Sequence, residues 1–272
     1  MTAPAKIRLD QYLAQSGLVP SRERARALIL AGRILVNEQK IDKPGAAVAA
    51  DAALRILGEQ QRYVSRGGLK LEHALRHWRV PVSNRDCLDV GTSTGGFTDC
   101  LLQHDAASVT CVDTGFGQID IRLRNDPRVH LHERTNARLL PVGSFAPSAQ
   151  RSEPVPTLLV MDVSFISATL LLPAVLAAAP RITEAVILVK PQFEAGREHI
   201  GKGGIVRDPA AHQLAIRRVT RCMAELHATS IQTTPSPITG AEGNVEFLLH
   251  ARFDSRADIR IDSQPAPATA PN

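Results

Sequence analysis

Aromatic residues are scarce in this chain of 272 residues: they make up 4% of it, whereas hydrophobic residues make up 44%. The core must therefore be built from leucine, valine, isoleucine and alanine, which is typical of parallel sheets flanked by helices. The length suffices for one large α/β domain and one small domain.

Cysteine is also sparse, and the four residues present, Cys87, Cys100, Cys111 and Cys222, form no Cys-x-x-Cys pair. This pattern argues against a zinc site and favours reduced thiols in a cytoplasmic protein. His73 and His77 are one helical turn apart, but the glutamate of a zincin motif is missing. We interpret them as part of an ordinary amphipathic helix and expect no metal.

No stretch is long and apolar enough to span a bilayer, and the N-terminus lacks an apolar signal core. The most apolar stretch, 168–179, contains Pro173 and is predicted to be a core helix. We therefore expect no membrane partner. The formal net charge is +5 and the pI is about 9.3, which favours a polyanionic partner such as nucleic acid.

A short apolar run at 87–90 breaks into glycine-rich sequence before a helical pattern begins at Phe97. A buried strand, a glycine turn and a helix start form a ligand-binding corner, because glycines let a ligand approach the backbone and the helix start offers free N–H groups. The spacing does not fit the dinucleotide fingerprint. Gly91, Ser93 and Gly95 match the nucleophile elbow of serine hydrolases, with Ser93 as nucleophile.

The same corner also fits the first loop of a class I methyltransferase, in which an acidic residue such as Asp89 precedes a loop that holds the methionine part of S-adenosylmethionine. A glycine turn that binds nothing is the third possibility. The hydrolase needs a later histidine and an acid, and His199, His212 and His250 are all weakly placed for that role.

Further along the chain, charged residues stand at the ends of predicted strands: Asp113, Asp162 and Lys190, with Glu246 inside the last predicted strand. In an open parallel sheet, ligands bind outside the carboxyl ends of the strands. Asp113 follows the glycine loop by about twenty residues, where an acid can accept both hydroxyls of a ribose. The alternative is that Asp162, Lys190 and Glu246 form structural ion pairs, because unpaired buried charges are costly.

The N-terminal region is rich in arginine on two short predicted helices and the strand that follows. The residues that we expect to contact RNA there are Arg8, Arg22, Arg24, Arg26 and Arg33. From about Ile7 to Leu57 this segment resembles the small RNA-binding domain first seen in ribosomal protein S-four. The resemblance implies contacts with structured RNA through shape and phosphates.

Most of the chain, from about Ile7 to Phe253, resembles the TlyA family of bacterial ribosomal RNA 2′-O-methyltransferases, some of which are named hemolysins. The motifs that carry the resemblance are Ser65–Leu71, Leu88–Asp99, Glu133–Arg138, Asp162–Ser167, Val189–Glu194, Gly201–Pro209 and Pro235–Phe247. Two departures are Thr92, where alanine is common, and a longer connection at 141–156.

The resemblance implies S-adenosylmethionine as methyl donor and a Lys-Asp-Lys-Glu tetrad, which falls on Lys70, Asp162, Lys190 and Glu246. A ribose 2′-hydroxyl is barely acidic, so its attack on the methyl group needs a base in line with the methyl–sulfur bond. Lys190 is the candidate base, and Asp162 would orient it. The donor's amino-acid end would lie against the corner that contains Asp89, Gly91, Ser93 and Gly95, and its ribose against Asp113.

The segment 201–208 contains three glycines and the cations Lys202 and Arg207. We predict a mobile loop that becomes ordered on RNA; a plain linker is the alternative.

We predict an α/β fold: a class I (Rossmann-like) methyltransferase domain with a mostly parallel central sheet and an antiparallel last strand, preceded by a small α+β RNA-binding domain. The expected bounds are 1–61 for the small domain, 62–68 for a linker, 69–253 for the large domain and 254–272 for a disordered tail. The expected substrate is a ribose, of a cytidine, in ribosomal RNA within a ribosomal subunit. A membrane-lytic protein and a non-catalytic RNA-binding factor remain alternatives.

Overall fold

The computed structural model describes residues 6–19, 21–57, 62–148, 154–240 and 242–254. The chain divides into two compact units, Met1–Arg62 and Tyr63–Asn272, and each is described by itself. The predicted tail, apart from Asp254, lies outside the described residues.

The small unit packs two helices against short strands. Its elements are β1 (Lys6–Arg8), α1 (Leu9–Gln15), α2 (Arg22–Leu30), β2 (Ile34–Val36), β3 (Gln39–Lys40), β4 (Ala47–Ala49) and β5 (Leu54–Ile56). The hydroxyl of Ser21 caps α2 by accepting a hydrogen bond from the Arg24 N–H. The amphipathic pattern of Leu9, Tyr12 and Leu13 favours a helix from Ile7, but residues 6–8 instead pair with β4 as a strand.

The large unit alternates strands and helices. Its elements are α3 (Gly67–Trp78), β6 (Asp86–Val90), α4 (Gly96–Gln103), β7 (Ser108–Val112), α5 (Ile121–Arg124), β8 (Val129–His132), β9 (Leu158–Met161), α6 (Leu172–Ala178), β10 (Glu184–Val189), α7 (Pro191–Glu194), α8 (Pro209–Glu225), β11 (Ser230–Pro235) and β12 (Phe247–Arg252). Short 3₁₀ turns cover Ala137–Leu139 (η1), Ala168–Leu170 (η2), Arg197–His199 (η3) and Lys202–Gly204 (η4).

The strands of this unit form one seven-stranded sheet in the order β11-β12-β10-β9-β6-β7-β8. Neighbours from β10 to β8 are parallel, whereas β12 runs antiparallel to both β10 and β11. This confirms the predicted fold class, with a mostly parallel sheet and an antiparallel last strand.

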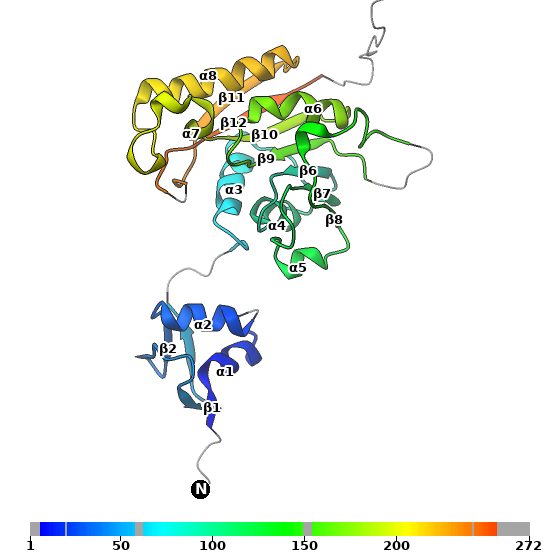
Figure 1. Cartoon of the computed structure of the whole chain (residues 1–272). Helices are drawn as coiled ribbons and strands as arrows, with labels where there is room; N and C mark the ends of the chain where they lie inside the picture. The colour runs from blue at the N-terminus through cyan, green and yellow to red at the C-terminus, as the bar shows by residue number, and fades with distance from the viewer. Residues whose placement is uncertain (1–5, 20, 58–61, 149–153, 241, 255–272) are drawn as a thin grey trace, which may run out of the picture. The chain divides into compact units, whose positions relative to one another are not determined.

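Helices cover both faces of the sheet (Figure 1). One hydrophobic cluster joins the sheet to α6 and α8, with Leu172, Val175 and Val219 fully buried. The other cluster joins it to α3, α4 and α5 through side chains such as Leu71 and Leu101. The core is aliphatic, as the scarcity of aromatic residues predicted, and burial of these side chains drives formation of the layers.

Tyr63 already belongs to the large unit and is buried, so most of the segment expected to be a linker packs within this unit. α3 begins at Gly67 after Arg66, without a side-chain cap. Glu246 directly precedes β12 rather than lying inside it. This last difference concerns an element boundary, which sequence patterns locate least well.

The chain order of the sheet reverses between β6 and β9, and the loops after these two strands therefore diverge. Gly91 follows β6 with φ 84°, and a Cβ at this position would overlap the backbone carbonyl of Asp162 after β9. Only glycine permits this positive φ and this close approach at the switch point.

Candidate functional site

The charged residues predicted at strand ends lie at one edge of the sheet. Asp113, Asp162 and Lys190 directly follow the parallel strands β7, β9 and β10. Glu246 directly precedes the antiparallel strand β12, so it lies at the same edge. The carboxyl end of the parallel sheet thus presents three acids and one lysine side by side.

Lys190 and Asp162 form an ion pair at this edge. The Lys190 Nζ lies 2.7 Å from Asp162 Oδ1 and donates a hydrogen bond of 2.7 Å to the Ser164 hydroxyl. Asp162 Oδ1 is buried, and the Lys190 ammonium compensates its charge. The same ammonium also donates to the Ser164 hydroxyl, so Lys190 is held between these two groups.

Lys70 and Glu246 form a second, more deeply buried pair. The Lys70 Nζ donates a hydrogen bond of 2.5 Å to Glu246 Oε2, and both side chains are buried. Lys70 stands on the first turn of α3, where the helix dipole disfavours a cation. The carboxylate of Glu246 offsets that cost, which explains how a lysine is accommodated there.

The two ion pairs are neighbours. Val189 is opposite Phe247 in the β10–β12 register, so Lys190 and Glu246 occupy adjoining positions on adjacent strands. A methyl group placed on Gly67, at the start of α3, would lie 3.9 Å from Asp162 Oδ2. The four residues predicted as a tetrad therefore converge from α3, β9, β10 and β12.

A cavity of about 570 Å³ opens beside the Asp162 end of this cluster, which is within the usual size range of small-molecule sites. The loops after β6, β7 and β9 line it, together with the turn before η1. The polar lining residues are Ser93, Asp113, Thr114, Gln118, Thr135, Asn136, Asp162 and Ser164.

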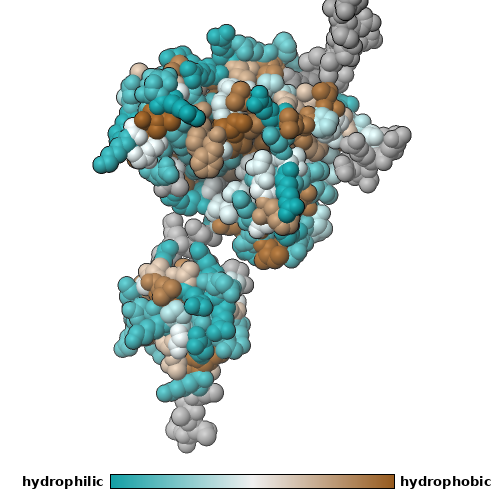
Figure 2. Space-filling view, in the orientation of Figure 1, coloured by the Kyte–Doolittle hydropathy of each residue, from teal (hydrophilic) through white to brown (hydrophobic). Residues whose placement is uncertain are grey.

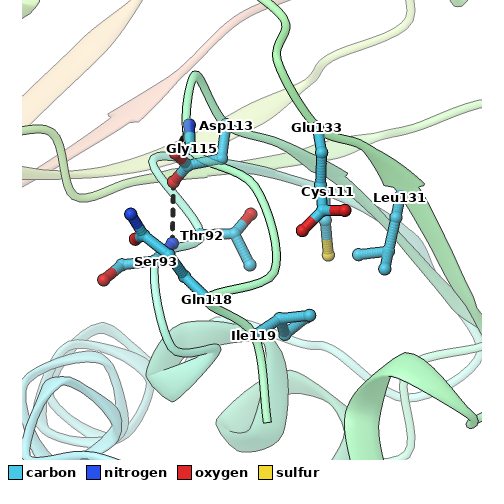
Figure 3. A pocket seen from close by; sticks show the side chains of 9 residues that line it. All are labelled: Thr92, Ser93, Cys111, Asp113, Gly115, Gln118, Ile119, Leu131 and Glu133. Carbon is cyan, nitrogen blue, oxygen red and sulfur yellow. Dashed lines mark hydrogen bonds between the residues drawn. The ribbon is translucent and has the colours of Figure 1, made fainter. Parts of the chain in front are cut away.

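The Asp113 carboxylate, which lines this cavity, is oriented by two backbone N–H groups. Its Oδ2 accepts a hydrogen bond of 2.8 Å from the Ser93 backbone N–H, and its Oδ1 accepts one of 2.7 Å from the Gly115 N–H. Figure 3 shows this carboxylate above Ser93. Each oxygen keeps a lone pair for a further donor, so the carboxylate is oriented and remains able to accept from a ligand hydroxyl.

Asp89 is placed differently from the other predicted cofactor residues. Its side chain is 0% exposed, and its Oδ2 accepts a hydrogen bond of 2.6 Å from the Thr98 hydroxyl. Burial, with the nearby charges of Asp162 and Asp113, raises the pKa of Asp89 to about 7. The Asp89 side chain therefore lies in the core between β6 and α4, where it is bonded to Thr98 of α4. Its complete burial was not predicted from the sequence.

Ser93 has φ 51°, the left-handed backbone that a nucleophile elbow also uses. The described residues that line the two pockets beside Ser93 include no histidine. His250 is buried against Glu184, and the His212 ring lies 2.9 Å from the Val206 carbonyl oxygen. The site therefore lacks the base that a serine hydrolase needs.

Three of the arginines predicted to bind RNA donate hydrogen bonds within the small unit. Arg8 and Arg22 both donate to Asp10, whose side chain is fully buried. The hydrogen bond from Arg8 is the main reason that the pKa of Asp10 is lowered to about 2. Arg33 donates to the Leu57 carbonyl, and Arg26 is exposed on α2. The small unit has a largely hydrophilic surface in the view of Figure 2.

Lys202 and Arg207, predicted to contact RNA, are exposed in the large unit. Lys202 stands in the turn η4, and Asp208 after Arg207 caps α8. The turn is tied to the core, because the Asn244 amide donates to the Gly204 carbonyl at 3.0 Å and accepts from the Val206 N–H at 2.9 Å. Whether this segment orders on RNA stays a prediction.

Sequence reasoning gave no individual role to Ser164, although it belongs to the motif Asp162–Ser167. Its position two residues after a strand-end acid was the available signal. The described residues contain no group of three or more His, Cys, Asp or Glu that could hold a metal ion. Within the same residues, no helix is long and apolar enough to cross a membrane.

Comparison with known families defines the class of protein. The model of the FtsJ-like methyltransferases matches residues 63–253, and the S4 domain model matches residues 7–53. The chain is therefore an FtsJ-like methyltransferase preceded by an S4 domain.

Individual relatives place it more narrowly. It is 42% identical over 248 residues to the 16S/23S rRNA (cytidine-2′-O)-methyltransferase TlyA of Mycobacterium tuberculosis, covering 91% of this chain and 90% of the relative. Hemolysin A of Brachyspira hyodysenteriae is 38% identical over 244 residues, covering 90% and 99%. A solved hemolysin-like structure from Streptococcus thermophilus is 40% identical, with a TM-score of 0.66 and coverage of 93% and 90%. The chain belongs to the TlyA family.

The buried Asp89 generates a prediction about stability and pH. The folded protein keeps this proton up to about pH 7, whereas an unfolded aspartate releases it near pH 3.8. Between these values the folded state binds more protons, so Asp89 makes the free energy of unfolding fall as pH rises, and its contribution levels off above about pH 7. Asp89→Asn, which keeps an acceptor for Thr98, should remove this decline.

Urea unfolding at a series of pH values from 5 to 8 measures the free energy of unfolding of wild type and of Asp89→Asn, and the effect is the difference between the two free energies. The difference should grow with pH, up to a few kcal/mol, on the order of 1.4 kcal/mol per pH unit within the window. Parallel pH profiles for the two proteins would contradict the assignment of a buried, protonated Asp89.

Proposed function

We propose that this protein transfers a methyl group from S-adenosylmethionine to the ribose 2′-hydroxyl of a cytidine in ribosomal RNA, within a ribosomal subunit. The observation that carries the proposal is the pair of adjoining ion pairs, Lys190–Asp162 and Lys70–Glu246, at the edge of a cavity of about 570 Å³. The names of the TlyA relatives support the substrate, and the S4 domain supports RNA as the partner.

The residues present fit the methyl donor. The turn at Gly91 brings backbone close to the cavity without side-chain bulk, and Asp113 is fixed with free lone pairs toward a ribose. In this arrangement Gly91, Ser93 and Gly95 would hold the amino-acid end and Asp113 the ribose hydroxyls. When bound, S-adenosylmethionine supplies an electrophilic methyl group on a positively charged sulfur.

Lys190 acts as the general base in this proposal. The Lys190 ammonium would first release a proton to solvent, and the neutral Nζ would then accept the proton of the 2′-hydroxyl as the oxygen attacks. The Asp162 oxygen 2.7 Å away then stabilises the ammonium that results. Lys70, paired with Glu246, would add a second cation near the target ribose.

The test is to incubate the protein with labelled methyl donor and ribosomal subunits and to map the methylated ribose. Lys190→Ala should lower the transfer rate about 100-fold or more, because a positioned base contributes roughly that factor. Lys190→Arg is the matched variant: it keeps the cation opposite Asp162 but cannot give up a proton.

Full transfer by Lys190→Arg would show that Lys190 is only a structural ion-pair partner, the alternative left open by the sequence. Ser93→Ala should retain transfer, because Ser93 contacts Asp113 through its backbone N–H rather than its hydroxyl. Failure of wild-type protein to methylate any subunit would overturn the proposed function.

The small unit supplies the RNA contact in this proposal, and two arginines of α2 separate binding from stability. Both side chains are exposed, but only Arg22 donates a hydrogen bond to buried Asp10. Both Arg22→Ala and Arg26→Ala should weaken binding to ribosomal RNA, with a smaller salt dependence. Only Arg22→Ala should also lower stability, by about 1–3 kcal/mol, because it removes a partner of a buried carboxylate.

Filter binding at several salt concentrations and thermal unfolding of the full chain measure the two effects. Arg26→Ala should change the free energy of unfolding by about 0.5 kcal/mol or less. Equal stability losses would contradict the role assigned to Asp10, and unchanged RNA affinity in both variants would contradict the assigned RNA surface.

A further inference from the structure

The segment 162–168, which follows β9, carries two of the groups that contact Lys190. Asp162 and Ser164 lie at its start, and both line the cavity. Phe165 at its centre has φ 67° and is 93% exposed, so burial of this side chain does not hold the segment in place. Val163, Ile166 and Ala168 of the segment pack in the hydrophobic cluster that includes α6 and α8, and a further, polar interaction joins the segment to α7.

Glu194 makes that interaction from the end of α7. Its side chain is buried, with Oε1 accepting a hydrogen bond of 2.7 Å from the Ala168 N–H and Oε2 one of 2.5 Å from the Ser167 hydroxyl. Burial raises the pKa of Glu194 above its ordinary value, although both hydrogen bonds act in the opposite direction. A carboxyl group is costly to bury, and its two hydrogen bonds to segment 162–168 offset that cost.

The position of Glu194 in the chain links its contacts to Lys190. α7 begins directly after Lys190, and Glu194 is its last residue. Its own backbone carbonyl accepts a hydrogen bond of 2.6 Å from Arg218 of α8, which anchors α7 to the body of the unit. The rings of Phe165 and Phe193 are also in contact, with centroids 5.5 Å apart. The C-terminal end of segment 162–168 is therefore held by Glu194 of α7, and its start contacts Lys190, which directly precedes α7.

We propose that Glu194 is a positioning residue for the methyl transfer: it holds segment 162–168 against α7, so that Ser164 and Asp162 stay within reach of the Lys190 amine. This inference rests on the proposed function for its kinetic consequence. Glu194 touches neither Lys190 nor the cavity in the contacts described, and it acts through the segment that does.

A buried glutamate elsewhere in the unit provides a matched control. Glu184 stands at the other end of the same strand, β10, six residues before Lys190. It is equally buried and accepts from Arg85 and His250 at 2.8 Å each. Loss of either glutamate should disturb packing, but only Glu194 contacts segment 162–168.

The experiment compares Glu194→Ala, Glu194→Gln and Glu184→Ala in the full chain, with kinetics on ribosomal subunits corrected for the folded fraction. Glu194→Ala should lower kcat about tenfold to hundredfold, because small misplacements of a base are costly, with KM for RNA within about threefold of wild type. Glu194→Gln should restore kcat to within about threefold, because its amide can accept from Ala168 and donate to Ser167. Glu184→Ala should keep kcat per folded molecule.

Hydrogen exchange supplies a readout that is independent of activity. Exchange of the Ala168 amide and its neighbours in 162–168 should accelerate in Glu194→Ala and stay slow in Glu184→Ala. Unchanged exchange at Ala168, equal kcat losses in both alanine variants, or failure of glutamine to rescue would each overturn the inference. A wild-type protein that transfers no methyl group would instead overturn the proposed function, and the exchange result would still decide whether Glu194 holds the segment.

Discussion

The site depends on the cost of burying charge. An ammonium or carboxylate at the edge of a packed sheet is tolerated only if an opposite charge and hydrogen bonds compensate for the lost water. Here the compensation is mutual between segments far apart in sequence: Lys70 with Glu246, and Lys190 with Asp162. Each pair ties two elements together, so the same interactions that make the charges tolerable also assemble the four-residue cluster beside the cavity.

A similar logic operates in the small unit. Asp10 is buried under the arginines that the sequence marks as RNA contacts, and it binds Arg8 and Arg22. A guanidinium has five donors in a rigid fork, so an arginine held by one carboxylate still presents donors to a phosphate. The buried acid therefore holds two arginines of the surface that we propose to bind RNA, which would reduce the side-chain freedom lost on binding.

Part of the candidate site could be predicted from the sequence, because the geometry of a parallel sheet places the ends of its strands together. Asp113, Asp162 and Lys190 each end an apolar run, and parallel strands end at one edge, so their convergence followed from pattern alone. Lys70, on a helix, and Glu246, before an antiparallel strand, have no such rule, and their inclusion came from family resemblance. The depth of Asp89 was missed because a strand buried on both faces has no alternation to show which way a side chain points.

The contacts of Ser164 and Glu194 could not be predicted, because they join loops whose relative positions arise only when β9 and β10 pair. The strand at Lys6–Arg8 was missed for the same reason: its partner, Ala47–Ala49, lies about forty residues away. Local propensity assigns such residues to the neighbouring helix, whereas the non-local pairing decides the outcome.

The central claim is that the methyl donor's sulfur lies where the two ion pairs meet. A crystal structure of the protein with bound S-adenosylhomocysteine tests it most directly. The account predicts the sulfur at the Asp162 side of the cavity, facing Lys190, with the ribose hydroxyls on Asp113. A sulfur bound away from Asp162 and Lys190 would contradict it.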